Sequence, residues 1–302
     1  MAIERDVMND EIPPPPDPKQ LLREFELGAK KSFGQNFLRD QNMLRVIAEA
    51  AMRRAPQGVV VEIGAGLGAL TYHLLAVGLR VIAIERDRDL VPILKREFAW
   101  AGDKLSLREM DAAKLDYQAL AEELGGPVTM VGNLPYQISS RLLVGLAEAG
   151  SAVHASVVMV QKEVAERVVA VPRTKEYGLL SVLTQFAFAG EFVRIVPPEA
   201  FVPRPKIISA VIALNKAEND FDESDIESAI AAARVAFSTR RKTLRRILAN
   251  RFRLKSEEAA KLIGACGFTE DVRAEEIDLL GFVSLGRVLE KFVADGRTGK
   301  ES

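Results

Sequence analysis

The sequence predicts an α/β fold in which a doubly wound, mostly parallel sheet is followed by a smaller helical domain. Three observations lead to this prediction. Short apolar runs alternate with amphipathic stretches along most of the chain, a glycine-rich turn follows the first of these runs, and the alternation stops after Leu214. Such alternation is typical of parallel strands joined by helices. With 302 residues, of which 48% are hydrophobic, the chain is long enough for two domains with buried cores.

The first 28 residues differ in composition from the rest of the chain. They contain the proline tract Pro13–Pro16 and then Pro18, and proline favours extended backbone that cannot donate hydrogen bonds. We therefore expect a flexible leader over residues 1–28. After Asp40, a helix is predicted from apolar residues at helical spacing, which are Leu44, Ile47, Ala48 and Ala51.

Seven apolar runs are the candidate strands of the sheet. Helical stretches fit between the first five runs, as a parallel sheet requires. Four prolines lie between the last two runs, which suggests an antiparallel hairpin at one edge. The sheet domain is predicted to cover residues 29–214. Its candidate strands are Val59–Ile63, Arg80–Glu85, Lys104–Met110, Val128–Val131, Ala155–Val160, Phe192–Val196 and Ile207–Leu214.

The chain after Leu214 is predicted to form a helical domain over residues 215–302. Residues 215–225 are polar and acidic, and the pattern that follows them is helical. A helix near the end of the chain is indicated by apolar residues at helical spacing, which are Leu285, Val288, Leu289, Phe292 and Val293.

Charge and rare residues exclude several kinds of site. Lys and Arg number 41 against 42 Asp and Glu, so the protein has no global positive field and any nucleic-acid face must be local. One cysteine and two histidines argue against a disulfide framework and against a metal site. No apolar run approaches the about 18 residues of a membrane span, and no secretory signal precedes the domains. We therefore expect a cytoplasmic protein without metal or membrane anchor.

The strongest local signal for a cofactor is the turn Gly64–Gly68, which lies between the strand Val59–Ile63 and a helical stretch. Glycines allow a tight turn and a close approach of the backbone to a ligand, while a helix amino terminus presents free N–H groups. Glu85 ends the second strand, where a carboxylate can accept hydrogen bonds from both hydroxyls of a ribose. These features predict an adenosine-containing cofactor.

Two further acids favour one such cofactor over another. Gly64, Gly66 and Ala69 also fit the dinucleotide pattern of nicotinamide-dependent dehydrogenases. However, Glu62 before the first glycine suits an amino-acid ammonium better than a pyrophosphate, and Asp111 at the end of the third strand can accept from an adenine amine. The layout resembles methyltransferases that use S-adenosyl-L-methionine. For any single acid, capping of a loop is an equally good interpretation.

The tetrapeptide Asn133–Tyr136 ends the fourth strand, at the edge where α/β sheets place their ligands. The exocyclic amine of adenine is a poor nucleophile because its lone pair is delocalised. If the Asn133 side-chain oxygen and the Leu134 carbonyl each accept one amine hydrogen, the lone pair becomes available to a methyl donor. Tyr136 offers a ring on which the base stacks. The alternative is an ordinary turn with a half-buried aromatic.

Together these motifs resemble the small-subunit (16S) ribosomal RNA adenine dimethyltransferases, over nearly the whole chain from Lys30 onward. The resemblance implies a Rossmann-like class I methyltransferase that dimethylates N6 of two adjacent adenosines near the 3′ end of small-subunit ribosomal RNA. It also implies cofactor contacts from Asn36 and Leu38, and it implies that Phe201 closes on the target base opposite Tyr136. The alternative for Phe201 is a loop anchor packed on the core. The matching stretches are Lys30–Leu38, Gly64–Gly68, Asn133–Tyr136, Gln161–Val164, Phe201–Lys206 and Arg240–Arg245.

Two positions depart from the family pattern, and three other functions remain open. Ala65 replaces the usual proline of the glycine loop, which removes some loop rigidity but no contact atom, so we expect cofactor binding to survive. Thr239 replaces a common glutamine, which bears only on a detail of RNA contact. A large-subunit adenine methyltransferase of the antibiotic-resistance type is the nearest alternative, and the Arg240–Arg245 motif argues against it. A nicotinamide-dependent oxidoreductase and a non-catalytic ribosome assembly factor are alternatives from other classes.

Positive charge is concentrated between Ser228 and Ser256, which hold nine Lys or Arg and no acid. A face that serves only solubility normally mixes acids with bases, so we expect this stretch to bind phosphates of ribosomal RNA. The alternative is a solvated helix face. The expected partner is an immature small ribosomal subunit, bound by a monomer. The stretch should be anchored by its apolar residues Ile230, Phe237, Leu244 and Leu248. The side chains that remain available to contact RNA are Arg240, Arg241, Lys242, Arg245 and Arg246.

Overall fold

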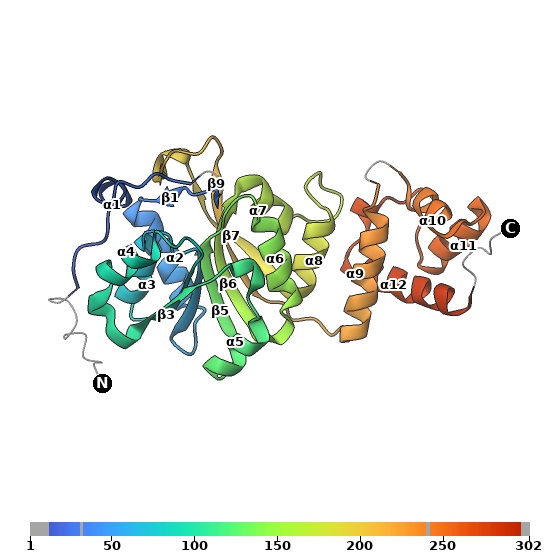
Figure 1. Cartoon of the computed structure of the whole chain (residues 1–302). Helices are drawn as coiled ribbons and strands as arrows, with labels where there is room; N and C mark the ends of the chain where they lie inside the picture. The colour runs from blue at the N-terminus through green and yellow to red at the C-terminus, as the bar shows by residue number, and fades with distance from the viewer. Residues whose placement is uncertain (1–11, 31–32, 240–241, 297–302) are drawn as a thin grey trace, which may run out of the picture. The chain divides into compact units, whose positions relative to one another are not determined.

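The computed structural model describes residues 12–30, 33–239 and 242–296, and the chain forms two compact units (Figure 1). The first unit comprises the chain up to residue 165 together with residues 190–216, and the second comprises residues 166–189 and the chain from residue 217. Residues 166–189 were expected in the sheet domain. They belong to the second unit because Tyr177, Val182 and Phe186 are buried among its helices.

The first unit is built on a seven-stranded sheet in the order β4-β3-β2-β5-β6-β9-β7. Strands β2 to β6 are parallel, and β9 pairs antiparallel with β6. The predicted α/β class is therefore confirmed, and β9 and β7 are neighbours at one edge, as the proline-rich connection suggested. The strands are β2 (Val59–Ile63), β3 (Arg80–Glu85), β4 (Leu105–Glu109), β5 (Val128–Asn133), β6 (Val153–Gln161), β7 (Phe188–Val196) and β9 (Ser209–Lys216).

A helix precedes or follows each strand of the parallel part. The helix after Asp40 forms as predicted, and the Asp40 side chain caps it by accepting a hydrogen bond from the Met43 N–H at 3.0 Å. The last helix of this series runs across the border of the two units. The helices are α2 (Gln41–Met52), α3 (Ala69–Ala76), α4 (Val91–Glu97), α5 (Tyr117–Leu124), α6 (Ser139–Glu148) and α7 (Lys162–Val168).

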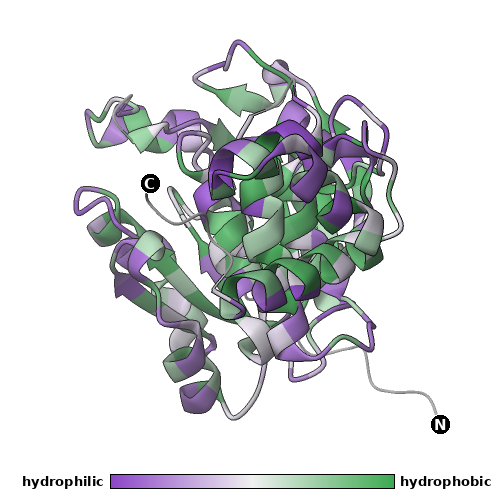
Figure 2. Cartoon of the chain, turned by 90° about the vertical axis from the view of Figure 1, so that its right-hand side faces the viewer, coloured by the Kyte–Doolittle hydropathy of each residue, from purple (hydrophilic) through white to green (hydrophobic). Residues whose placement is uncertain are grey.

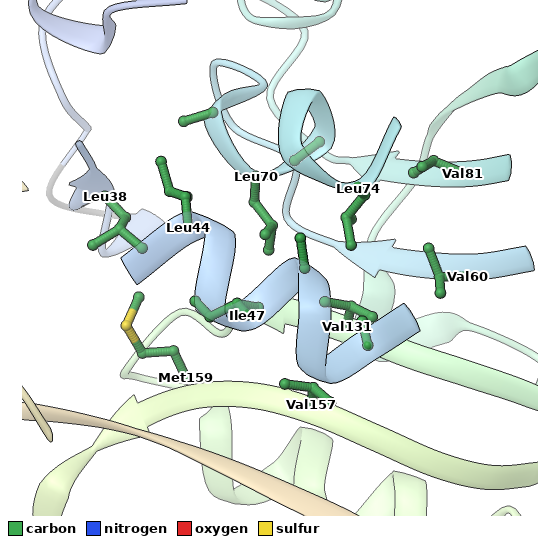
Figure 3. Packing of buried hydrophobic residues seen from close by; sticks show 14 of the residues in the cluster. Leu38, Leu44, Ile47, Val60, Leu70, Leu74, Val81, Val131, Val157 and Met159 are labelled. Atoms are coloured by element: carbon green, nitrogen blue, oxygen red, sulfur yellow. The ribbon is translucent and has the colours of Figure 1, made fainter. Parts of the chain in front are cut away.

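Helices α2 and α3 cover one face of the sheet. Figure 3 shows Leu44 of α2 and Leu70 and Leu74 of α3 lying among side chains of the strands. Burial of each such side chain contributes about 1.5–3 kcal/mol, so this cluster fixes the sheet whose strand ends carry the candidate site. Strand residues of the same cluster include Val60, Val81, Val131, Val157 and Met159.

The leader differs from its prediction. Pro18–Glu24 form helix α1, which starts at the Asp17 cap, and Leu21 is only 4% exposed. Leu21 packs with Phe37 and other residues of the first unit. Asp followed by Pro is a helix-start signal, and the proline tract before it obscured that signal. Residues 1–11 lie outside the described part of the chain.

The second unit is helical and has its own core. Hydrophobic and hydrophilic residues lie on different sides of its helices (Figure 2). Helix α12 approaches α9 closely at Gly286, where a Cβ would lie 2.6 Å from the Ser228 carbonyl carbon. Helix α12 includes all five apolar residues that predicted a helix near the end of the chain, so that prediction is confirmed. The helices are α8 (Leu179–Ala187), α9 (Glu223–Ala236), α10 (Leu244–Phe252), α11 (Ser256–Ala265) and α12 (Leu279–Ala294).

Membrane spans and metal clusters are both absent from the described ranges. No helix in them has the length and apolar character needed to cross a bilayer. In the same ranges, His, Cys, Asp and Glu nowhere gather in groups of three or more that could hold a metal ion.

Candidate active site

A cavity lies at the carboxyl ends of β2, β3 and β5 in the first unit, where the polar residues singled out in the sequence converge. Its empty space, counted together with the solvent at its open mouth, is about 730 Å³. One wall is the segment Phe33–Phe37, which precedes the sheet in the chain. Residues of the predicted site that line it are Asn36, Gly64, Gly66, Glu85, Asp111, Asn133, Leu134 and Tyr136.

The glycine turn has the backbone that only glycine adopts readily. Gly64, Gly66 and Gly68 have φ values of 72°, 61° and 82°. A Cβ at Gly66 would lie 3.2 Å from the Phe37 ring, and one at Gly68 would lie 2.1 Å from the Phe98 ring. The turn therefore needs glycine both for its backbone and for the side chains packed against it.

Glu85 faces the glycine turn from the end of β3. Its Oε2 accepts a hydrogen bond from the Gly66 N–H at 2.8 Å, and its Oε1 accepts one from the Asp87 N–H at 2.8 Å. Burial raises the pKa of Glu85, although these N–H groups oppose the shift. The carboxylate is thus held in a fixed orientation in the cavity wall, where it can accept hydrogen bonds from ribose hydroxyls.

Glu62 lies deeper than expected. It is 1% exposed and lines a second, smaller cavity under the glycine turn, next to Leu38 and Asn133. Its Oε2 accepts a hydrogen bond from Thr71 Oγ1 at 2.6 Å. Burial raises the pKa of Glu62 to about 7. A positively charged group in this smaller cavity would therefore find a carboxylate that is only partly ionised near neutral pH.

Asp111 fits both interpretations that the sequence allowed. Its Oδ1 accepts a hydrogen bond from the Ala113 N–H at 3.0 Å and so caps the short 3-10 turn Ala112–Lys114. Its Oδ2 lies 3.8 Å from Nη1 of Arg86. The Arg86 guanidinium in turn stacks over the Phe33 ring at 4.3 Å. Arg86 is a cavity residue that the sequence motifs did not single out, and Phe33, which lies within the motif Lys30–Leu38, is a cavity residue to which no role was assigned.

Asn133 is oriented by the segment that forms the cavity wall. Its Nδ2 donates a hydrogen bond to the Asn36 carbonyl at 3.0 Å. Because the amide nitrogen is engaged there, the Oδ1 oxygen is the part of the carboxamide that remains to accept a hydrogen from a substrate amine. Next to it, the Leu134 N–H donates to the Met159 carbonyl at 3.0 Å, which fixes the backbone that carries the second proposed acceptor.

Tyr136 lies half-buried in the cavity wall. Its hydroxyl lies 2.6 Å from the Ser209 Oγ at the start of β9. Burial raises the pKa of Tyr136, and the contact with Ser209 opposes that shift. The phenol is therefore neutral at physiological pH and the ring is fixed at both ends.

Phe201 and Leu38 are both buried, and neither lines the larger cavity. Strand β1 (Phe37–Leu38) pairs antiparallel with β8 (Phe201–Val202), which sets Leu38 opposite Phe201. Both side chains are 4% exposed and join the core. Phe201 is not among the residues that line either cavity, so its position is that of a loop anchor. Leu38 lines only the smaller cavity.

The described part of the basic stretch includes the end of α9, the loop residue Lys242, α10 and the short connection to α11. Arg240 and Arg241 lie outside the described residues. Lys242 and Arg246 are exposed, as RNA contacts require. Arg245 instead donates a hydrogen bond from Nη1 to Glu270 Oε2 at 2.7 Å. Glu270 lies beyond the basic stretch in the sequence, so counting charges within the stretch could not identify it as a partner of Arg245. Of the expected apolar anchors, Leu244 and Leu248 are buried, and Ile230 and Phe237 are partly buried.

Comparison with known proteins identifies relatives of this chain. The family model for ribosomal RNA adenine dimethylase matches residues 27–282. The ribosomal RNA small subunit methyltransferase A of Anaeromyxobacter dehalogenans is 42% identical over 288 residues, covering 91% of this chain and 98% of that protein. The protein of the same name from Desulfitobacterium hafniense is 39% identical over 263 residues, covering 87% and 93%.

Two solved structures share the fold. A dimethyladenosine transferase from Plasmodium falciparum has a TM-score of 0.69 and 25% identity, covering 86% of this chain and 98% of its own. The 23S rRNA methyltransferase ErmE has a TM-score of 0.64 and 24% identity, covering 84% and 100%; at this identity the likeness concerns the fold alone. The family model and the curated relatives show that the chain belongs to the ribosomal RNA adenine dimethylase family.

Proposed function

We propose that this protein transfers methyl groups to N6 of two adjacent adenosines near the 3′ end of small-subunit ribosomal RNA. The observation that carries the proposal is the Asn133 carboxamide, whose nitrogen is held by the Asn36 carbonyl at 3.0 Å beside the cavity. This contact leaves an oxygen acceptor at the carboxyl end of a parallel strand. An acceptor so placed suits an exocyclic amine.

The residues of the cavity fit S-adenosyl-L-methionine, which supplies an electrophilic methyl group when bound. Glu85 would hold the ribose, because its fixed carboxylate can accept from two hydroxyls. Asp111 would accept from the adenine amine, and Glu62 would face the ammonium from the adjoining smaller cavity.

The chain acts on the substrate amine by position and not by proton abstraction. Asn133 Oδ1 and the Leu134 carbonyl would each accept one amine hydrogen, which draws electron density onto the nitrogen and directs its lone pair. Tyr136 would stack on the base, and its neutral phenol, tied to Ser209, keeps the ring in place. None of these residues needs to change its protonation state.

The substrate that we propose is ribosomal RNA within an immature small subunit, met by a monomer in the cytoplasm. Lys242 and Arg246 are exposed cations of the second unit, and exposed cations are suited to phosphate contacts that position a substrate without reading its sequence. The described helices include none that could span a membrane.

The decisive experiment uses methyl-labelled S-adenosylmethionine with immature small subunits that lack the modification. Label on two neighbouring adenosines of the small-subunit RNA is the expected result. Label on large-subunit RNA would instead support the antibiotic-resistance alternative. Subunit binding without label would support a non-catalytic assembly factor, and tight binding of NAD without methyl transfer would support an oxidoreductase.

A further inference from the structure

Asp87 is a buried charged residue that the chemistry described above does not use. It follows β3, two residues after Glu85, and is 2% exposed. Its Oδ1 lies 2.5 Å from Lys30 Nζ and accepts from the Asp89 N–H at 3.1 Å, while its Oδ2 accepts from Gln35 Nε2 at 2.7 Å. Both oxygens are therefore satisfied, as a buried carboxylate requires.

The two side-chain donors come from one distant segment of the chain. Lys30 and Gln35 precede Asp87 by more than 50 residues, and they also bind each other, since the Lys30 N–H donates to Gln35 Oε1 at 2.7 Å. Burial alone would raise the pKa of Asp87, but the hydrogen bonds from Lys30 and Gln35 outweigh it and hold that pKa below its ordinary value. The carboxylate is thus charged and paired throughout the neutral range.

The segment that Asp87 holds is the wall of the active-site cavity. Gln35, Asn36 and Phe37 line that cavity, and the Asn36 carbonyl receives the Asn133 Nδ2 at 3.0 Å. The Asp87 N–H also donates to Glu85 Oε1 at 2.8 Å. One buried residue therefore connects the carboxylate proposed for the ribose with the segment that orients the catalytic amide.

We propose that Asp87 is a positioning residue that fastens the segment Gln35–Phe37 over the cofactor cavity, slowing cofactor release and holding the Asn133 carboxamide in its acceptor orientation. This inference rests on the proposed function of Asn133. It differs from a general stabilising role, because it assigns the effect to the lifetime of the bound cofactor and to the rate of methyl transfer.

The test compares the full-length variants Gln35→Ala and Asp87→Asn with the control Asp89→Asn. Asp89 also pairs with Lys30, at 2.6 Å, but its side chain is 54% exposed, and Gln35 Nε2 donates to Asp87 and not to Asp89. The probe is S-adenosylhomocysteine, whose release is followed by chase with excess unlabelled ligand. Gln35→Ala and Asp87→Asn should release it about tenfold faster with an unchanged association rate, since each removes a hydrogen bond to a buried charge. The control should stay within twofold.

The transfer reaction gives a second readout. At saturating cofactor and RNA, kcat should fall in Gln35→Ala and Asp87→Asn while KM for the RNA stays constant, because Asn133 loses its orientation and the RNA-binding surface is untouched. The double variant should be no slower than the slower single variant, since both changes break the same contact.

Unchanged release rates in both variants would overturn the inference. If Asp87→Asn fails to fold, Gln35→Ala decides alone, because it leaves the carboxylate and Lys30 in place. A wild-type protein that binds S-adenosylhomocysteine but methylates no RNA would overturn the proposed function and still leave the release rates to decide the role of Asp87.

Discussion

The Tyr136 hydroxyl lies 2.6 Å from the Ser209 Oγ, so the ring proposed to stack on the target base is tied to the first residue of β9. This contact joins the end of β5 to a strand that is reached only about 70 residues later. Ser209 is fully buried, and its hydroxyl therefore has little freedom to find another partner. The stacking surface is fixed by tertiary structure, not by the tetrapeptide alone.

Removing this contact should slow methyl transfer moderately. We expect Ser209→Ala to reduce the single-turnover rate roughly three- to tenfold, the value of one ordinary hydrogen bond. In a Tyr136→Phe background, the same change should have no further effect, because the hydroxyl partner is already absent. Ser156→Ala is the matched control: this serine is also buried, and its hydroxyl has no partner among the described residues. Additive effects in the double variant would mean that Ser209 acts elsewhere.

Cofactor affinity should depend on Glu85 more than on Asp111. Glu85→Ala removes a buried carboxylate with two hydrogen-bond contacts of its own, and we expect at least tenfold weaker binding of S-adenosylmethionine, from about 1.5–3 kcal/mol for a charge-assisted hydrogen bond. Asp111→Ala should weaken binding less, since the Asp111 side chain is 32% exposed and water replaces part of the contact. Isothermal calorimetry measures both. Wild-type affinity in both variants would refute the assignment of the cavity.

Loss of the Asn133 carboxamide should affect the chemistry and spare the cofactor. Asn133→Ala is expected to lower the single-turnover rate about 100- to 1,000-fold, as the removal of a preorganised polar group does, while the Kd of S-adenosylmethionine changes little. Asn219→Ala, in the second unit, is a suitable control because, within the described residues, that amide bonds backbone groups of Phe186 and Phe221 and lines neither cavity. A rate within a few-fold of wild type would show that another group orients the amine.

Glu62 should make both stability and cofactor binding depend on pH. Its pKa of about 7 in the folded protein exceeds the ordinary 4.5, so its contribution to stability is complete below pH 4.5 and is lost as the pH rises to 7. Glu62→Gln should therefore be more stable than wild type by up to about 3 kcal/mol at pH 8 and equal to it at pH 4. Denaturant titrations at the two pH values measure this difference.

If Glu62 faces the cofactor ammonium, wild-type affinity for S-adenosylmethionine should increase between pH 6 and pH 8, because the ionised carboxylate attracts that group. The Glu62→Gln variant should lack this increase. A pH-independent affinity in the wild type would place the ammonium elsewhere.

Exposed cations of the second unit should control RNA binding separately from the cofactor. Lys242→Gln with Arg246→Gln should weaken binding to the ribosomal substrate and reduce its log–log salt slope by about 0.7–0.9 for each phosphate that is no longer neutralised. Lys261→Gln, an exposed lysine of the same unit, is the control. Arg245→Gln should act mainly on stability, through its bond to Glu270. An unchanged salt slope in the double variant would move the RNA footprint to another surface.

The sheet was predictable because its parallel strands are short runs of mostly apolar residues. Val59–Ile63 and Arg80–Glu85 have the same bounds in the structure as in the prediction, and their acids fall at the strand ends by simple counting. Strand β7 starts at Phe188, four residues before its predicted start. The prediction missed this start because most residues of the strand are exposed and do not form an apolar run.

The sequence did not reveal contacts between residues that are distant along the chain. Lys30, Gln35 and Asp87 are ordinary polar residues in their local contexts, and only the folded chain brings them together. Phe201 is a second such case: the family resemblance implied that it closes on the target base, whereas in the structure it pairs with Leu38 and its side chain is buried in the core. Side-chain direction at such positions is decided by pairing partners that composition does not identify.

The contact between Gly68 and Phe98 bears on how related chains should be judged. Because the Phe98 ring lies 2.1 Å from where a Cβ at Gly68 would be, this glycine is required for packing whether or not a cofactor is ever bound. A relative that had lost its enzymatic activity would still be under selection to keep it. An intact glycine turn is therefore weak evidence that such a relative is active, whereas a change at Asn133 would be informative, since no comparable steric demand of the fold protects that side chain.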